Sequence, residues 1–148
     1  MNLLIVDDEY LVVEEVVTVT DWELLGITEI YSATNAVSAV RILNEKKIDI
    51  MICDIEMPQT DGLELSKKAK ENFPDLEIVM LTSHAEFNYV RNALRYGCYD
   101  YLLKPVMEDD IIKVMKNLVT KIERERHQAQ LQEEGIVWLS LIHISEPT

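Results

Sequence analysis

The sequence of 148 residues is poor in glycine and cysteine and has no long hydrophobic run. Its four glycines are too few and scattered for the glycine-rich loops of P-loop and dinucleotide-binding proteins. Two cysteines, Cys53 and Cys98, do not suffice for a disulfide framework or a thiolate zinc site, so we expect small buried residues in a reducing, cytoplasmic setting. No stretch approaches the ~20 apolar residues of a membrane span, and we expect neither a signal peptide nor a membrane partner.

Basic residues are also scarce. Lys and Arg together number 14, against 27 Asp and Glu, and the formal net charge is −13 at pH 7. The acidic excess lies within residues 1–110, because residues 111–148 carry five acidic and five basic residues. Proteins hold phosphate backbones and anionic lipids with Lys and Arg, so this balance disfavours direct binding to nucleic acid. A hydrophobic content of 48% is still that of a globular domain with a core.

Short apolar segments alternate with helical patterns along the first 120 residues. These segments predict five short strands, over 3–6, 28–33, 49–54, 77–81 and 99–103, of which the first is expected to be buried. Five helices are expected between and after them, over 9–24, 36–43, 63–72, 86–96 and from 108 onward. Strands that alternate with helices form a parallel sheet through right-handed crossovers. The pattern predicts a doubly wound α/β domain with strand order 2-1-3-4-5.

The C-terminal part follows a different pattern. Four apolar residues recur there at helical spacing: Ile111, Met115, Leu118 and Ile122. A charged run follows over 123–126, so two interpretations stay open, a final helix with a solvated end or a short dimerising coiled coil. Residues 139–148 resemble the translation of a transposon-end adapter from sequencing libraries. We therefore expect a domain over 1–120, an extended helix or linker over 121–138 and a non-native tail over 139–148.

Polar side chains stand where four of the predicted strands end. They are Asp7 and Asp8 after the first strand, Asp54 after the third, Thr82 after the fourth and Lys104 after the fifth. In the order 2-1-3-4-5 these positions are neighbours at one sheet edge, where ligands of such sheets bind. Strands lie roughly 4.8 Å apart, so the acid pair and Thr82 flank Asp54, and the long side chain of Lys104 spans most of a gap of about 10 Å.

These residue types together predict a phosphoryl site. Three crowded carboxylates need a cation to stay ionised, and Mg²⁺ prefers such oxygen ligands. Mg²⁺ and the Lys104 ammonium would neutralise phosphoryl oxygens, Thr82 would donate a hydrogen bond, and Asp54 would be the nucleophile. Taken singly, the residues have plainer interpretations: Asp7 and Asp8 as an acidic helix start, Thr82 as a cap and Lys104 as a solvated charge.

These residues resemble the receiver domain of two-component response regulators. The matching segments are IVDDE (5–9), DIEMPQTDG (54–62), Thr82 and YDYLLKP (99–105), and the resemblance runs from about residue 2 to 120. It implies a CheY-like, flavodoxin-like fold and a phosphoprotein of two-component signal transduction. The segments DWELLGI (21–27) and HAEFNYVRNAL (84–94) are similar to receivers that precede AraC-type helix-turn-helix domains.

The resemblance also implies roles for single residues. It makes Asp54 the phospho-acceptor and places Mg²⁺ on Asp7, Asp8, Asp54 and the backbone carbonyl of Glu56. The side chains of Glu56 and His84 occupy positions that modulate loss of the phosphoryl group in the family. A carboxylate beside a phosphoryl group repels it or recruits another cation, so we expect an unusual phosphorylated-state lifetime.

A second group of implied roles concerns switching. The resemblance implies a cis peptide bond between Lys104 and Pro105, and it makes Thr82 and Tyr101 a switch pair. Thr82 would move toward the phosphoryl group while the Tyr101 ring, otherwise a packed strand aromatic, turns inward. The readout face would be the fourth helix, fifth strand and fifth helix, through which a homodimer could form.

The resemblance implies that a sensor histidine kinase phosphorylates the chain, which then regulates transcription through a C-terminal DNA-binding domain outside these residues. DNA would be contacted only through that domain, and no external substrate would be turned over, so we do not expect an enzyme. A distant alternative is a phosphohydrolase similar to haloacid dehalogenase-type enzymes, which also form an aspartyl-phosphate. The acid pair before the nucleophile, and Glu56 where a general-acid aspartate would stand, argue against it. A docking module that never needs phosphate is a further alternative.

Overall fold

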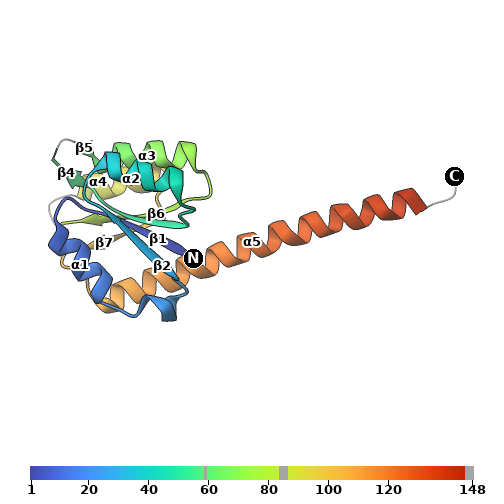
Figure 1. The fold of residues 1–148 in the computed structure, drawn as a ribbon, viewed down its shortest axis with the longest axis horizontal. Helices are drawn as coiled ribbons and strands as arrows, with labels where there is room; N and C mark the ends of the chain where they lie inside the picture. Colours follow the sequence, from blue (N-terminus) through green and yellow to red (C-terminus); the bar gives the residue numbers. More distant parts are fainter. Residues whose placement is uncertain (59, 84–86, 146–148) are drawn as a thin grey trace. The chain divides into compact units, whose positions relative to one another are not determined.

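The computed structural model describes residues 1–58, 60–83 and 87–145 (Figure 1). The chain divides into two compact units, Met1–Met115 and Lys116–Thr148. The first unit contains every strand of the described residues, and the boundary falls within the last helix.

The first unit is built on a parallel sheet. Its five strands are β1 (Asn2–Val6), β2 (Glu29–Ala33), β3 (Ile50–Asp54), β6 (Glu77–Thr82) and β7 (Asp100–Leu103). They are ordered β2-β1-β3-β6-β7, which is the predicted 2-1-3-4-5 when these strands are counted along the chain. The central strands β3 and β6 are buried at every position, as expected for apolar strands covered on both faces.

Helices cover both faces of the sheet. They are α1 (Tyr10–Thr18), α2 (Ala36–Glu45), α3 (Gly62–Asn72), α4 (Phe87–Arg95) and α5 (Glu108–Ser145). Figure 1 shows α2, α3 and α4 on one face and α1 with the start of α5 on the other. Side chains alternate along a strand, so Leu4 and Val6 of β1 join the core under α2 to α4. The predicted five-helix, doubly wound architecture is confirmed.

The helix predicted over 9–24 is interrupted. α1 ends at Thr18, and a separate 3-10 helix, η1, covers Trp22–Leu25. Asp21 caps η1 with its side chain, a local hydrogen bond that competes with continuing the first helix. Buried Trp22 donates its indole N–H to the carbonyl of Val16 over 3.1 Å. Val16, Val19 and Trp22 continue the helical spacing of apolar residues through this turn, so the sequence pattern does not show the break.

A short antiparallel pair was also not predicted. β4 (Glu56–Met57) pairs with β5 (Thr60–Asp61) directly after β3. Two residues a strand are too few to show an alternating pattern. The Gly62 N–H donates to the Ile55 carbonyl over 2.9 Å and closes this loop onto the start of α3.

The long helix α5 carries the predicted apolar stripe, whose members Ile111, Met115, Leu118 and Ile122 are all buried. The side chains of 123–135 are exposed, which suits both a solvated helix end and a coiled coil. Residues 139–145 continue the helix, and the non-native origin of 139–148 stays a prediction. In the described part of the chain, no helix combines the length and apolar character needed to cross a membrane.

Candidate functional site

The predicted polar residues meet at the carboxyl edge of the sheet. Asp54 ends β3 and Thr82 ends β6, while Asp7 and Lys104 directly follow β1 and β7. The register aligns Val6 with Cys53 and Asp54 with Leu81, so Asp7, Asp54 and Thr82 lie on adjacent strands. The Ile55 N–H donates to the Leu81 carbonyl over 3.0 Å and holds the chain after Asp54 against β6.

Three carboxylates form the centre of the site. Oxygens of Asp7, Asp8 and Asp54 lie within 4.8 Å of one another. Asp7 is fully buried, Asp54 is 5% exposed, and Asp8 is exposed. One oxygen of Asp7, Oδ1, accepts the Glu9 N–H over 2.9 Å and organises the turn into α1. This bond lies before the helix: the N-cap residue of α1 is Glu9, with no side-chain capping bond, and the first turn of α1 has no acidic residue. The interpretation of Asp7 and Asp8 as an acidic helix start is therefore wrong, and the other oxygen of Asp7, Oδ2, faces Lys104.

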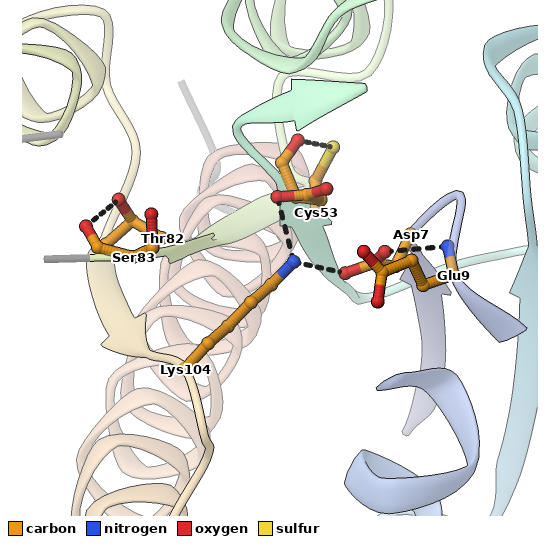
Figure 2. Close-up of polar contacts among 7 residues, drawn as sticks. Asp7, Glu9, Cys53, Thr82, Ser83 and Lys104 are labelled. Atoms are coloured by element: carbon orange, nitrogen blue, oxygen red, sulfur yellow. Dashed lines mark hydrogen bonds and ion pairs between the residues drawn. The ribbon is translucent and has the colours of Figure 1, made fainter. Parts of the chain in front are cut away.

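Lys104 reaches across the sheet to two of these carboxylates. Its Nζ lies 2.8 Å from Asp7 Oδ2 and 3.2 Å from Asp54 Oδ1 (Figure 2). The Lys104 N–H donates to the Thr82 carbonyl over 2.8 Å, which fixes the lysine backbone beside β6. The peptide bond between Lys104 and Pro105 is cis. The long side chain closes the gap anticipated from the sequence and passes beyond Asp54 to Asp7.

The surroundings raise the pKa of Asp54. Burial raises it most and the negative charge of Asp7 raises it further, while Lys104 and the Glu56 N–H act in the opposite direction. The result is a pKa of about 6. Burial alone would lower the pKa of Lys104, but the nearby negative charges of Asp7 and Asp54 outweigh it, so this pKa is raised. Negative charge is thus in excess at the site.

The carboxylates fit a divalent cation. Asp7 Oδ2 is buried, and no donor in the described residues gives it a hydrogen bond of good geometry. The Lys104 ammonium forms an ion pair with this oxygen at 2.8 Å. One ammonium does not balance three carboxylates, and the carboxylates of Asp7, Asp8 and Asp54 are the hard oxygen ligands that Mg²⁺ prefers.

The remaining predicted residues surround this centre. Thr82 is 1% exposed, and its hydroxyl donates to the Ser83 carbonyl over 3.1 Å. Tyr101 on β7 is 40% exposed, so the expectation of a packed strand aromatic was wrong, because β7 is an edge strand. Glu56 is exposed and its N–H faces the Asp54 carboxylate. His84 lies outside the described residues. Both cysteines are buried, as predicted.

Sequence reasoning missed the part that Gly62 plays at the site. An added Cβ at Gly62 would lie 1.9 Å from the Asp54 carbonyl oxygen, so this residue must be glycine for α3 to approach the acceptor strand. The neighbouring Asp61 caps α3, since its Oδ1 accepts the Leu63 N–H over 2.9 Å.

Comparisons with known proteins agree with this geometry. Residues 3–116 match the family model of the response regulator receiver domain. The chain is 34% identical over 124 residues to the transcriptional regulatory protein YesN of Bacillus subtilis, covering 84% of this chain and 34% of YesN. It is 31% identical over 145 residues to the response regulator SaeR of Staphylococcus aureus, covering 98% of this chain and 61% of SaeR.

A solved structure is similar as well. The REC domain of AraT, a response regulator from Geobacillus stearothermophilus, superimposes with a TM-score of 0.79 at 30% identity, covering 84% of this chain and 97% of that domain. The chain spans only 34% to 61% of the two full-length relatives named above. The matched segment includes Asp7, Asp54, Thr82 and Lys104. The resemblance found in the sequence is confirmed, and the chain belongs to the receiver domain family of two-component response regulators.

Proposed function

We propose that this protein accepts a phosphoryl group from a sensor histidine kinase onto Asp54, with Mg²⁺ held by Asp7, Asp8 and Asp54. The observation that carries the proposal is the buried Asp54 carboxylate between Asp7 and the Lys104 ammonium. An Asp54 oxygen attacks the phosphorus of the kinase phosphohistidine, a P–O bond forms and the P–N bond breaks. The departing histidine nitrogen keeps the bonding electrons and takes up a proton.

The chain supplies several groups for this transfer. Lys104 Nζ lies 3.2 Å from Asp54 Oδ1, so its charge can stabilise oxygens of a phosphoryl group attached there. The Thr82 hydroxyl, at the next strand end, needs to exchange its bond to the Ser83 carbonyl for one to the phosphoryl group. The Glu56 backbone carbonyl would help the three carboxylates to hold Mg²⁺, which would supply further positive charge for the transfer. Because burial disfavours the ionised form of Asp54, these cations keep its nucleophilic form available.

Phosphorylation would then alter an output surface. In this proposal Thr82 moves toward the phosphoryl group and the exposed Tyr101 ring turns inward, changing the face formed by α4, β7 and α5. Exposed Leu94 on α4 and Leu103 on β7 give that face apolar character, which suits a regulated homodimer contact. The readout would be a DNA-binding domain in a longer cytoplasmic protein, as the length of the relatives allows. The chain would assist its own phosphorylation and dephosphorylation and turn over no external substrate.

The test is the transfer itself. Incubation with Mg²⁺ and acetyl phosphate, followed by intact mass measurement, should add one phosphoryl group to the wild type and none to Asp54→Asn. Asp75→Asn, which neutralises an exposed carboxylate at the opposite sheet edge, is the matched control and should be phosphorylated normally. An adduct that persists in Asp54→Asn would overturn the assignment. Rapid multiple turnover of a phosphate ester would favour the phosphohydrolase instead, and no adduct from several donors would favour the docking module.

A further inference from the structure

A buried thiol contacts the backbone of the acceptor residue. Cys53 directly precedes Asp54 in β3 and is fully buried. Its Sγ donates a hydrogen bond to the Asp54 carbonyl oxygen over 3.5 Å (Figure 2). Burial raises the pKa of the Cys53 thiol, so the sulfur keeps its proton at neutral pH and can donate. The transfer proposed above uses the carboxylate of Asp54, whereas this bond holds its backbone carbonyl.

The packing of α3 against the sheet confines this thiol. Cys53 lies opposite Met80 of β6 in the strand register, and both side chains are 0% exposed. Buried Ser66 on α3 donates its hydroxyl to Met80 Sδ over 3.3 Å. Cys53 and Met80 belong to the apolar core under α2 to α4. Neighbours on two strands and one helix therefore restrict the Cys53 side chain and keep it beside the Asp54 carbonyl.

The Asp54 carbonyl belongs to the peptide group that leads from the acceptor to Glu56. Gly62 approaches the same oxygen so closely that an added Cβ would lie 1.9 Å from it. The other end of this peptide group is the Ile55 N–H, which donates to the Leu81 carbonyl over 3.0 Å. The next N–H, that of Glu56, donates to the Asp54 carboxylate. The orientation of this peptide group therefore affects where the main-chain groups of Glu56 lie.

We propose that Cys53 is a positioning residue whose thiol orients the peptide group between Asp54 and Ile55, so that Glu56 can serve the metal site and the acceptor. This inference rests on the proposed function, because only there does the Glu56 carbonyl help to hold Mg²⁺. Loss of the thiol bond keeps the three carboxylates but loosens Glu56. The Mg²⁺ affinity should fall by about threefold, near the lower end for one hydrogen bond, because a thiol is a weak donor.

The test is a Mg²⁺ titration by calorimetry, which does not depend on phosphoryl transfer, on three variants of Cys53. Alanine is smaller and valine larger than cysteine, and neither donates, so a loss shared by Cys53→Ala and Cys53→Val comes from the missing donor. Both should bind Mg²⁺ at least about threefold more weakly than the wild type. Cys53→Ser keeps a donor and should bind within about twofold of the wild type.

Urea denaturation of the same variants separates positioning from stability. All three should be less stable than the wild type, because each changes the size or polarity of a buried side chain. A purely structural role of Cys53 therefore predicts weaker Mg²⁺ binding for the serine variant as well. Binding by Cys53→Ser as weak as that by Cys53→Ala, or wild-type binding by both non-donating variants, overturns the inference.

Cys98 provides the matched control. It is the second buried cysteine and lies before β7, next to Tyr99, whose N–H donates to the Ile78 carbonyl near the start of β6 and thus at the opposite sheet edge. Cys98→Ala and Cys98→Ser should leave the Mg²⁺ affinity within about twofold. A loss at Cys98 as large as at Cys53 would show that any change in the core weakens the site, and would overturn the inference.

Two further results separate the possible failures. If the wild type binds no Mg²⁺ and takes up no phosphoryl group, the proposed function fails together with this inference. If the wild type does both and the Cys53 variants bind Mg²⁺ equally well, only the inference fails. If the alanine and valine variants do not fold, the infrared S–H band of Cys98→Ser decides, since Cys53 is then the only thiol. A band below that of a thiol in an apolar solvent supports the bond, and an equal frequency overturns it.

Discussion

A methyl group added at Gly62 should destabilise the protein and displace the acceptor loop. Gly62 begins α3, where an added Cβ would lie 1.9 Å from the Asp54 carbonyl oxygen and 2.8 Å from the Ile55 carbonyl oxygen. Both obstacles are backbone atoms, which cannot rotate away as a flexible side chain can. Relief requires a shift of either the first turn of α3 or the chain directly after Asp54.

The size of the effect follows from these distances. Carbon and oxygen atoms in contact are normally about 3.3 Å apart or more, so a carbon 1.9 Å from the oxygen is far too close. Overpacking of this kind costs about 1–3 kcal/mol, occasionally more. The displacement also weakens the hydrogen bond from the Gly62 N–H to Ile55, worth about 1 kcal/mol. Replacing glycine by alanine also stabilises the protein by about 0.4–1 kcal/mol, because alanine restricts the unfolded chain. The net loss should be about 2–3 kcal/mol.

The other glycines provide graded controls. Gly97 has a φ of +92°, but no described atom lies within 4 Å of a Cβ placed there. Gly97→Ala should therefore cost only backbone strain, about 1–2 kcal/mol. Gly135 lies inside α5, again with no described atom within 4 Å of an added Cβ. Gly135→Ala should be neutral or stabilising by up to about 1 kcal/mol because alanine favours helix.

Urea denaturation followed by circular dichroism ranks the three variants by their free energy of unfolding. We expect Gly62→Ala to be the least stable, followed by Gly97→Ala and then Gly135→Ala. Gly62→Ala should also weaken Mg²⁺ binding, since the strain falls on the chain next to Asp54. A loss at Gly62 below about 1 kcal/mol, or no larger than at Gly97, would refute the argument that the close approach of α3 to β3 dictates glycine.

Four further substitutions test the charge of the site, the lifetime of its phosphoryl group and the cap of α3. The raised pKa of Asp54 means that its proton is held more tightly in the folded state, so the metal-free protein loses stability as pH rises through about 6. In EDTA, the free energy of unfolding of Asp54→Asn should exceed that of the wild type by about 1–2 kcal/mol at pH 7.5, a figure reduced for solvent screening. This difference should become smaller toward pH 4.5. A difference that does not change with pH contradicts the raised pKa of Asp54. Glu56→Ala should slow the loss of the phosphoryl group by about threefold, since a nearby carboxylate repels that group. The dephosphorylation rate is also measured for His84→Ala. If both variants lose the phosphoryl group at the wild-type rate, neither position modulates the lifetime. Asp61→Ala should cost about 1 kcal/mol in urea denaturation by removing the cap of α3, and equal stability would show that the cap contributes nothing.

The sheet and its functional edge could be predicted because their signals are local and strong. Strands such as 49–54 are continuous apolar runs that stop at a carboxylate, and parallel topology brings those stops to one edge. The breaks in this regularity could not be predicted. The turn after Thr18, the β4–β5 pair and the close approach at Gly62 depend on single capping bonds and short distances. Such features leave no periodic trace in a sequence.

Asp7 shows that one carboxylate can have a structural and a functional role at the same time. Its Oδ1 accepts the Glu9 N–H in the turn before α1, which is a structural bond but not the helix cap expected from the sequence. This bond fixes the carboxylate orientation and leaves Oδ2 buried, without a well-formed hydrogen bond from the described residues and beside Lys104. The structural bond thus prepares the functional role, because it fixes Oδ2 away from water and next to the positive charge of Lys104. The sequence predicted that Lys104 lies within reach of Asp54. The different contacts of the two Asp7 oxygens can be seen only in the three-dimensional structure.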